Sequence, residues 1–211
     1  SESVHAGNWA NNADWCYWDY PLIELEGKTI GIIGFGRIGQ AEGRIAKALG
    51  MNVLAYDLFP NDSGREIAEY VGLDELYARA DVITLHCNLT PENTGLINKE
   101  RIAKMKDGVV LINCARGELM DTTALIEGIE SGKIGALGLD VVEGERGIAH
   151  EDHRIDILSN QQMAYLRQFR NVTMTPHMAF YTDVAVSHMV ECGVAGLVEM
   201  LQNGDYFTKI K

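Results

Sequence analysis

The sequence is poor in several features that particular protein classes need. Only four of its 211 residues are cysteines, they are widely scattered, and no CxxC pair occurs, which favours free thiols in a reducing compartment. Acidic residues outnumber basic ones by 30 to 18, and the net charge of −12 argues against binding to nucleic acid or an anionic membrane. No signal peptide opens the chain and no apolar run approaches ~18 residues, so we expect a cytoplasmic protein.

A metal-binding pattern is also lacking. His150 and His153 flank an acidic pair, which resembles a metal cluster, but HExxH spacing and a third ligand are absent. We therefore expect a solvated loop there and no metal site. The hydrophobic content of 46% and charged content of 23% are typical of a soluble globular protein with one good core.

What the sequence does contain is a glycine-rich turn, Gly34-Phe35-Gly36-Arg37-Ile38-Gly39, between a predicted strand and a predicted helix. In such a turn the first glycine permits the tight bend, the second lets a pyrophosphate approach the backbone, and the third lets helix and strand pack closely. The free N–H groups at the start of the helix attract phosphate. This context predicts a dinucleotide-binding site at Gly34, Gly36 and Gly39.

The residue that ends the next predicted strand indicates which dinucleotide binds. Asp57 follows Gly39 by eighteen residues and would accept hydrogen bonds from the adenosine ribose hydroxyls. An NADP site needs a cation for the 2′-phosphate, and residues 58–61 contain no lysine or arginine. The sequence therefore favours NAD over NADP, with FAD as the weaker competitor.

Strands and helices continue to alternate after this unit. Strands are predicted at residues 28–34, 52–56, 82–85, 109–113, 134–139 and 172–174. Helices are predicted at residues 37–49, 74–80, 98–106, 121–131 and 183–202, with Asp121 and its neighbours suited to a cap and Gly132 ending that helix. Apolar strands between helices predict an α/β fold with a doubly wound, Rossmann-type parallel sheet.

Two regions interrupt the alternation. Residues 1–26 contain all three tryptophans and form an arm that packs either against a partner subunit or within the chain. Residues 143–168 form a polar insertion, predicted to be a loop with a short helix near the site. We divide the chain into this arm or interdomain crossover (1–26), an NAD-binding domain (27–185), and a C-terminal helix and tail (186–211).

Three segments at predicted strand ends carry reactive side chains: residues 113–118, 140–145 and 175–177. An arginine in the first can grip a carboxylate and polarise a carbonyl, and a histidine in the third can deliver a proton to the new alkoxide. An acidic partner from the second would favour the protonated histidine. Beside a nicotinamide cofactor, this set suits hydride transfer to a 2-keto acid. Cys87 and Cys114, also at strand ends, either line the ligand crevice or are small buried hydrophobes.

Several of these segments occur together in one known family. Residues 31–39, 81–86, 111–117, 131–133, 138–141 and 175–177 closely resemble the D-isomer-specific 2-hydroxyacid dehydrogenases. The resemblance implies NAD-dependent, reversible reduction of a 2-keto acid to a D-2-hydroxy acid. It also implies a homodimer formed through the NAD-binding domain. Members carry a second, substrate-binding domain, most of which is absent from this chain, so we expect NAD binding but poor turnover by this chain alone.

The same resemblance implies individual roles. Arg116 would bind and polarise the substrate, and Glu145 would pair with His177, the proton donor in reduction; Glu143 lies two residues away and could face the same side. The residues that would contact NAD are Gly34, Gly36, Arg37, Ile38 and Gly39 at the pyrophosphate, Asp57 at the ribose, Cys87, Asn88 and Asn93 on the adenosine side, and Cys114, Ala115 and Asp140 near the nicotinamide.

The sequence leaves open both the substrate and whether the site is catalytic. Asn88 and Arg146 stand where many members have proline, and residues 176–182 look like the D-lactate and D-2-hydroxyisocaproate branch. Residues 15–25 instead resemble the glycerate dehydrogenase, or hydroxypyruvate reductase, branch. The alternative from another class is a non-catalytic NAD(H)-sensing module, like the corepressors that share this fold.

Overall fold

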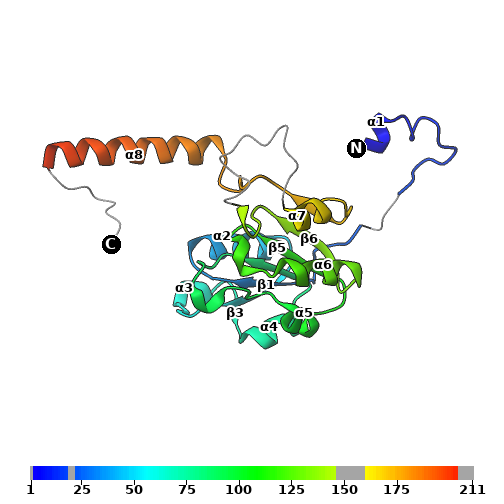
Figure 1. Cartoon of the computed structure of the whole chain (residues 1–211), viewed down its shortest axis with the longest axis horizontal. Coiled ribbons are helices and arrows are strands. Elements are labelled where there is room, and N and C mark those ends of the chain that lie inside the picture. The colour runs from blue at the N-terminus through cyan, green and yellow to red at the C-terminus, as the bar shows by residue number, and fades with distance from the viewer. Residues whose placement is uncertain (1, 19–21, 146–159, 204–211) are drawn as a thin grey trace.

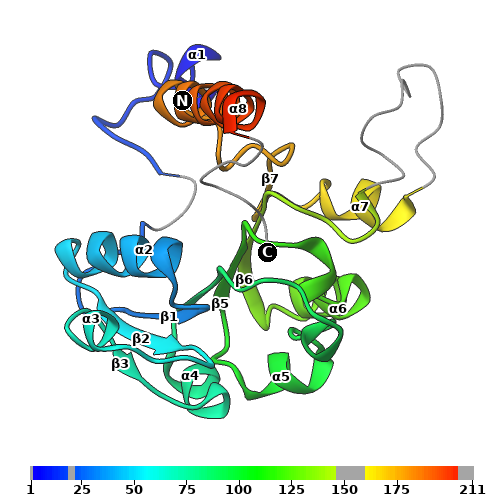
Figure 2. The same cartoon turned by 90° about the vertical axis from the view of Figure 1, so that its left-hand side faces the viewer.

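A computed structural model describes residues 2–18, 22–145 and 160–203 of the chain. Within them, seven strands form one parallel sheet in the order β3-β2-β1-β4-β5-β6-β7, with helices on both faces (Figures 1 and 2). The strands are β1 (Thr29–Ile33), β2 (Asn52–Tyr56), β3 (Glu69–Tyr70), β4 (Val82–Leu85), β5 (Val109–Asn113), β6 (Ile134–Leu139) and β7 (Val172–Met174). The predicted doubly wound α/β fold is confirmed.

The helices in the described residues are α1 (Glu2–His5), α2 (Arg37–Ala48), α3 (Asp62–Arg65), α4 (Leu73–Arg79), α5 (Lys99–Lys104), α6 (Thr122–Glu130), α7 (Gln161–Leu166) and α8 (Asp183–Asn203). Six of these helices lie between successive strands, whereas α1 precedes β1 and α8 follows β7. Two single turns of 3-10 helix, η1 (Pro91–Asn93) and η2 (Gly117–Leu119), lie in the connections. Helix α2 lies on one face of the sheet, and α4, α5 and α6 lie on the other (Figure 2).

The alternation of side chains along each strand divides the core into two clusters. Ile30 and Ile32 of β1 pack with Ala46 of α2 on one face, whereas Ile33 joins the larger cluster on the other face. Gly31 lies directly under Leu76 of α4, because a Cβ atom there would approach a Leu76 methyl carbon to 2.5 Å. Both faces of β1 are therefore buried, as expected for a central parallel strand.

The sequence did not predict strand β3 or the short helices α1 and α3. All six predicted strands occur, but β3 was missed because it is two residues long, Glu69 and Tyr70, and has no apolar run. The start of α6 is confirmed, since Asp121 caps it by accepting a hydrogen bond from the N–H of Ala124 at 3.1 Å. Gly132 follows the helix with φ of 74°, a left-handed conformation that glycine adopts easily.

The register of the sheet brings the functional segments to one level. Ile33 pairs with both Tyr56 and Leu85, and Asn113 pairs with both Leu85 and Leu139, so one row of residues crosses the sheet. Because the strands are parallel, the residues that follow this row all emerge at the same carboxyl edge. They are Gly34, Asp57, His86, Cys114 and Asp140, with Thr175 following Met174, the partner of Leu139.

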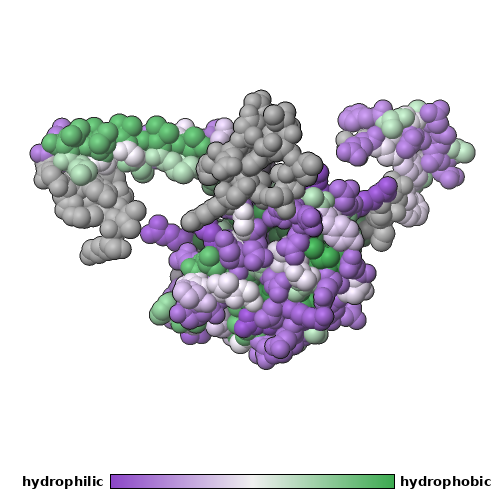
Figure 3. All heavy atoms as spheres, in the orientation of Figure 1, coloured by the Kyte–Doolittle hydropathy of each residue, from purple (hydrophilic) through white to green (hydrophobic). Residues whose placement is uncertain are grey.

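Two appendages extend beyond the sheet domain. The N-terminal arm with α1 and the long helix α8 stand apart from it on different sides in Figure 1. Trp15 is 91% exposed, and apolar side chains on α8 such as Leu197 and Leu201 are exposed as well, which Figure 3 shows as a green helix surface. The proposed domain boundaries at residues 26 and 185 remain predictions, with α8 beginning just before the second.

Helix α8 bears on the expectation from the sequence that no apolar run approaches ~18 residues. Among the described residues it is long and apolar enough, by length and composition only, to cross a membrane: Asp183–Gln202 has a mean hydropathy of 1.5 and is 0% buried. Polar residues interrupt the helix, so no purely apolar run marks it in the sequence. His150 and His153 lie outside the described residues, and within the described part no cluster of metal-ligating side chains occurs.

Candidate active site at the carboxyl edge of the sheet

The glycine turn between β1 and α2 has the geometry of a phosphate-binding loop. Gly34 has φ of 92°, and a Cβ atom there would collide with the backbone of Cys87. A Cβ atom on Gly39 would collide with the carbonyl oxygen of Gly34, so α2 can approach β1 only with glycine at this position. By contrast, a Cβ atom on Gly36 would meet nothing within 4 Å. The middle glycine therefore opens onto free space, where a ligand can approach the backbone.

The start of α2 faces that space. Gly36 is the N-cap residue, and no side chain caps the helix, so the first N–H groups of the helix are available to an anion. Arg37 and Ile38 follow directly, and the Ile38 side chain is 69% exposed. Free N–H groups and a guanidinium are hydrogen-bond donors for a pyrophosphate group, and the open glycine lets that group approach the backbone. The five residues predicted for the pyrophosphate thus lie together where the glycine turn leads into α2.

Asp57 connects the glycine turn with the end of β2. Its Oδ2 accepts a hydrogen bond from the N–H of Phe35 at 2.6 Å, and its Oδ1 accepts one from the N–H of Phe59 at 2.8 Å. A carboxylate oxygen can accept two hydrogen bonds, so capacity remains for ribose hydroxyls. Asp57 is partly exposed and lies at the edge where the sequence predicts the adenosine.

The three residues predicted for the adenosine side lie in one loop after β4. Asn93 donates to the carbonyl oxygen of Asn88 at 2.7 Å and lies 3.9 Å from Sγ of Cys87. Its Oδ1 also accepts a hydrogen bond from the N–H of Thr90. Asn93 is therefore engaged in shaping the loop, while Asn88 is exposed. Burial raises the pKa of the half-buried Cys87 thiol, with a smaller contribution from the charge of Asp57.

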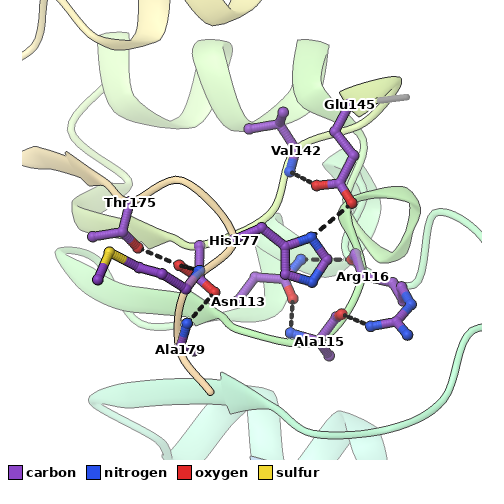
Figure 4. A network of polar contacts seen from close by, with 10 residues as sticks. Asn113, Ala115, Arg116, Val142, Glu145, Thr175, His177 and Ala179 are labelled. Atoms are coloured by element: carbon purple, nitrogen blue, oxygen red, sulfur yellow. Dashed lines mark hydrogen bonds and ion pairs between the residues drawn. The ribbon is translucent and has the colours of Figure 1, made fainter. Parts of the chain in front are cut away.

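The loop after β5 carries Arg116 and is held from below by a buried amide. Asn113 is 0% exposed, donates from Nδ2 to the carbonyl oxygen of Arg116 at 2.8 Å, and accepts from the N–H of Ala115 at 2.9 Å (Figure 4). Arg116 itself is exposed, and its Nη1 donates to the carbonyl oxygen of Ala115 at 2.6 Å. The guanidinium is thus tethered at one nitrogen and keeps other donors for a ligand.

His177 and Glu145 form a pair beside this loop. Nδ1 of His177 lies 2.9 Å from Oε1 of Glu145, and the imidazole points toward that carboxylate in Figure 4. Glu145 is held in turn by a long contact of 3.5 Å from the N–H of Val142 to its Oε2. With Nδ1 directed at the carboxylate, Nε2 is the nitrogen left to exchange a proton with a substrate.

The structure also separates the two candidate glutamates. Glu143 accepts a hydrogen bond from the hydroxyl of Thr122 at the start of α6, at 3.0 Å. Glu145, two residues later, is the one that contacts His177. Residues 146–159 of the insertion lie outside the described part, and α7 supplies the short helix that the sequence predicts within the insertion.

Asp140 lies beneath the loop that carries His177 and is only 4% exposed. Its carboxylate accepts from the hydroxyl of Thr175 at 2.5 Å and from the N–H groups of Met178 and Ala179 at 2.8 and 2.7 Å. Burial raises the pKa of this carboxyl, but these hydrogen bonds and the nearby His177 outweigh burial, so the pKa lies below its ordinary value. Asp140 is therefore a carboxylate at neutral pH.

Cys114 lies at the same edge, between Asn113 and Ala115, and is an exposed residue whose thiol is only partly covered. Its pKa is raised first by burial and further by the charges of Asp140 and Glu42, so the thiol form predominates near neutral pH. All four cysteines are free, as the sequence predicts. Of the two alternatives for Cys87 and Cys114, lining the crevice fits their partial or full exposure better than burial in the core.

Two residues that hold other parts of this site in place were not among the predicted site residues. Asn113 holds the Arg116 loop, and Thr175 binds Asp140 beneath His177. A signal for Asn113 exists, because a polar residue ends an otherwise apolar strand of five residues. The sequence indicates Thr175 only as part of the segment that ends at His177. Its partner, Asp140, lies 35 residues away in the chain.

Comparison with known proteins gives a consistent result. The family model of the D-isomer specific 2-hydroxyacid dehydrogenase, NAD binding domain, matches residues 1–179. A hydroxypyruvate reductase of Blautia hydrogenotrophica is 46% identical over 203 residues, which cover 96% of this chain and 59% of the relative. An aromatic 2-oxoacid reductase of Clostridium sporogenes is 48% identical over 183 residues, covering 86% and 55%.

A solved structure is also similar to this chain. The crystal structure of a Treponema pallidum D-lactate dehydrogenase superimposes with a TM-score of 0.88 at 35% sequence identity, covering 100% of this chain and 64% of that one. The chain thus spans a little over half the length of the two sequence relatives that it matches.

Proposed function

Because the chain belongs to the D-isomer specific 2-hydroxyacid dehydrogenase family and contains its NAD-binding domain, we propose that it serves the reversible reduction of a 2-keto acid to a D-2-hydroxy acid. The observation that carries this proposal is the His177–Glu145 pair beside Arg116, at the sheet edge that also holds the glycine turn and Asp57. NAD, when bound in the reduced form, supplies the hydride.

The chain's own residues would do the rest of the chemistry. Arg116 would bind the substrate carboxylate with guanidinium N–H groups other than the one given to Ala115. His177 would hold a proton at Nε2 and donate it to the alkoxide oxygen as that oxygen gains charge. Glu145, bonded at Nδ1, fixes the orientation of the imidazole.

The partners follow from the same reasoning. The relatives reported above are named for hydroxypyruvate, aromatic 2-oxoacids and D-lactate, which supports a small 2-keto or 2-hydroxy acid as substrate. We propose a homodimer formed through the NAD-binding domain, supported by the exposed apolar side chains of the arm. The proposal includes a cytoplasmic location, supported by four free thiols.

The test is oxidation of NADH by the 211-residue chain with pyruvate, hydroxypyruvate, 2-ketoisocaproate and phenylpyruvate, followed at 340 nm. Turnover should fall roughly a hundredfold or more in His177→Ala, with NADH affinity kept, since general acid catalysis contributes about that much. Glu145→Gln should also lower kcat, whereas Glu143→Gln, which loses only a contact to Thr122, should not. Failure of the chain to bind NADH, or equal effects of the two glutamate variants on kcat, would argue against the proposal.

A further inference from the structure

The loop that presents His177 has an unusual backbone. His177 has φ of 51°, and among the described residues it is the only non-glycine residue with a positive φ. Residues other than glycine rarely adopt this left-handed conformation, and they hold it only where the surrounding contacts determine it. The placement of the imidazole therefore depends on whatever fixes residues 175–179.

The contacts that fix this loop converge on Asp140. The backbone carbonyl of Asp140 accepts the N–H of His177 at 2.8 Å, and its carboxylate accepts the N–H groups of Met178 and Ala179, on the far side of His177. The hydroxyl of Thr175 donates to the same carboxylate at 2.5 Å from the near side. One buried side chain thus holds the chain both before and after the histidine.

Thr175 completes this arrangement. Its N–H donates to the carbonyl oxygen of Leu139 at 2.9 Å, which continues the pairing of β6 with β7, so its backbone is fixed by the sheet. Its side chain then orients the carboxylate of Asp140, and in Figure 4 it lies on the opposite side of the histidine from Glu145. Thr175 touches neither the substrate-binding Arg116 nor the glycine turn in the described contacts.

We propose that Thr175 is a positioning residue for the reaction: its hydroxyl holds the Asp140 carboxylate, which holds His177 in the left-handed conformation that directs the imidazole toward Glu145 and the substrate. This inference rests on the proposed function only for the role of His177. It adds to the role that the family resemblance gives Asp140 toward the nicotinamide, because Oδ2 receives one hydrogen bond and has capacity for a second.

The experiment compares Thr175→Val, which removes the hydroxyl at nearly constant shape, with Thr175→Ser, which keeps it. The control is Thr173→Val, an exposed threonine on the preceding strand. In the 211-residue chain, amide hydrogen exchange at Met178 and Ala179 is measured by NMR, together with NADH affinity and, where the chain turns over, kcat. Thermal melting establishes that each variant is folded at the assay temperature.

Thr175→Val should speed exchange at these two amides by about tenfold and lower kcat by a similar factor, while the Kd for NADH changes by no more than about twofold. Thr175→Ser should restore exchange and kcat, and Thr173→Val should alter neither. Unchanged exchange in Thr175→Val, or a serine variant as defective as the valine variant, would overturn the inference. If the wild-type chain binds no NADH, the proposed function fails, and the exchange rates still decide the role of Thr175.

Discussion

At the scale of single residues, Asp57 links two parts of the cofactor site. Its two carboxylate oxygens accept backbone N–H groups from Phe35, in the glycine turn, and from Phe59, beyond the end of β2. The residue expected to bind the adenosine ribose therefore also stabilises the loop expected to bind the pyrophosphate. A phosphate on the ribose would meet this carboxylate and no lysine or arginine in residues 58–61.

Asp57→Ala should weaken NADH binding by roughly tenfold to a hundredfold, since hydrogen bonds to a charged group contribute about 1.5–3 kcal/mol each. It should also reduce the discrimination between NADH and NADPH, because the repulsion of the 2′-phosphate is lost. Fluorescence titration of both cofactors measures this. The control is Asp62→Ala, an exposed aspartate in α3. Tight NADPH binding by the unmodified chain would refute the argument from Asp57.

At the scale of elements, the turn from β1 into α2 uses its glycines for different purposes. Gly39 lies against the carbonyl of Gly34, where a side chain has no room, so it serves the packing of helix on strand. Gly36 has φ of −77° and open space around a Cβ position, so alanine is compatible with the fold there. The need for glycine at position 36 arises from the ligand.

The two glycines therefore form a matched pair of substitutions. Gly39→Ala should lower the melting temperature by several degrees, since overpacking costs about 1–3 kcal/mol. Gly36→Ala should leave the melting temperature nearly unchanged and weaken NADH binding by about tenfold or more, because the methyl group occupies the space of the pyrophosphate. Calorimetry and NADH titration measure the two effects. A Gly36→Ala variant that binds NADH normally would contradict the assignment of the pyrophosphate to this turn.

At the opposite edge of the sheet, Asp81 joins the amino ends of three strands. It immediately precedes β4, and its carboxylate accepts from the N–H of Thr29 in β1 at 2.8 Å and from Nζ of Lys106, before β5, at 2.9 Å. Burial raises the pKa of Asp81, but the Thr29 N–H and Lys106 outweigh it, so the pKa lies below its ordinary value. The contact therefore stabilises the fold when the carboxyl is ionised.

The sign of the pH dependence follows. With a folded-state pKa below the unfolded value of about 3.9, the stabilisation is present above about pH 4 and is lost as pH falls through the folded pKa. Asp81→Asn should lower the free energy of unfolding by roughly 1–3 kcal/mol at pH 7, and the difference should shrink in acid. Urea denaturation at several pH values tests this. The control is Asp107→Asn, whose aspartate pairs with Lys133 but is 91% exposed. A constant difference from pH 7 to pH 3 would contradict the role of the Asp81 charge.

At the scale of the whole molecule, the sheet domain has a largely polar surface, whereas α8 exposes apolar side chains (Figure 3). The arm also exposes its tryptophans, Trp9, Trp15 and Trp18. A helix that is apolar on several sides is normally buried against other protein or in a membrane. The chain matches only 55–59% of the length of the two sequence relatives reported above, so the longer proteins have further residues available to cover such surfaces. Net charge of −12 disfavours an anionic membrane as the cover.

The 211-residue chain should therefore self-associate in a concentration-dependent manner, which sedimentation velocity detects as species heavier than 23.3 kDa. The double variant Val194→Asn and Leu197→Asn should weaken this association without changing the melting temperature of the sheet domain, since these side chains are 57% and 59% exposed. Leu58→Asn, which changes a still more exposed apolar residue outside α8, is the control. A monomer at all concentrations would contradict this expectation.

The sequence by itself determined the fold class and six of the seven strands, because apolar β-branched runs, glycines and caps act locally. It also predicted the site residues by type, since Arg116, Asp57 and His177 each end or follow a predicted strand. It did not predict β3, whose two residues pair only because β2 lies beside them.

Only the tertiary structure decided which of these residues act together. The choice of Glu145 over Glu143 depends on the turn at residues 142–145, which directs one carboxylate toward His177 and the other toward Thr122. The role of Thr175 depends on the register of parallel strands, which brings residues 35 positions apart into hydrogen-bonding distance. Local sequence fixes which side chain ends each strand, but the pairing of strands fixes which neighbour it meets, and the chemistry of this site depends on that pairing.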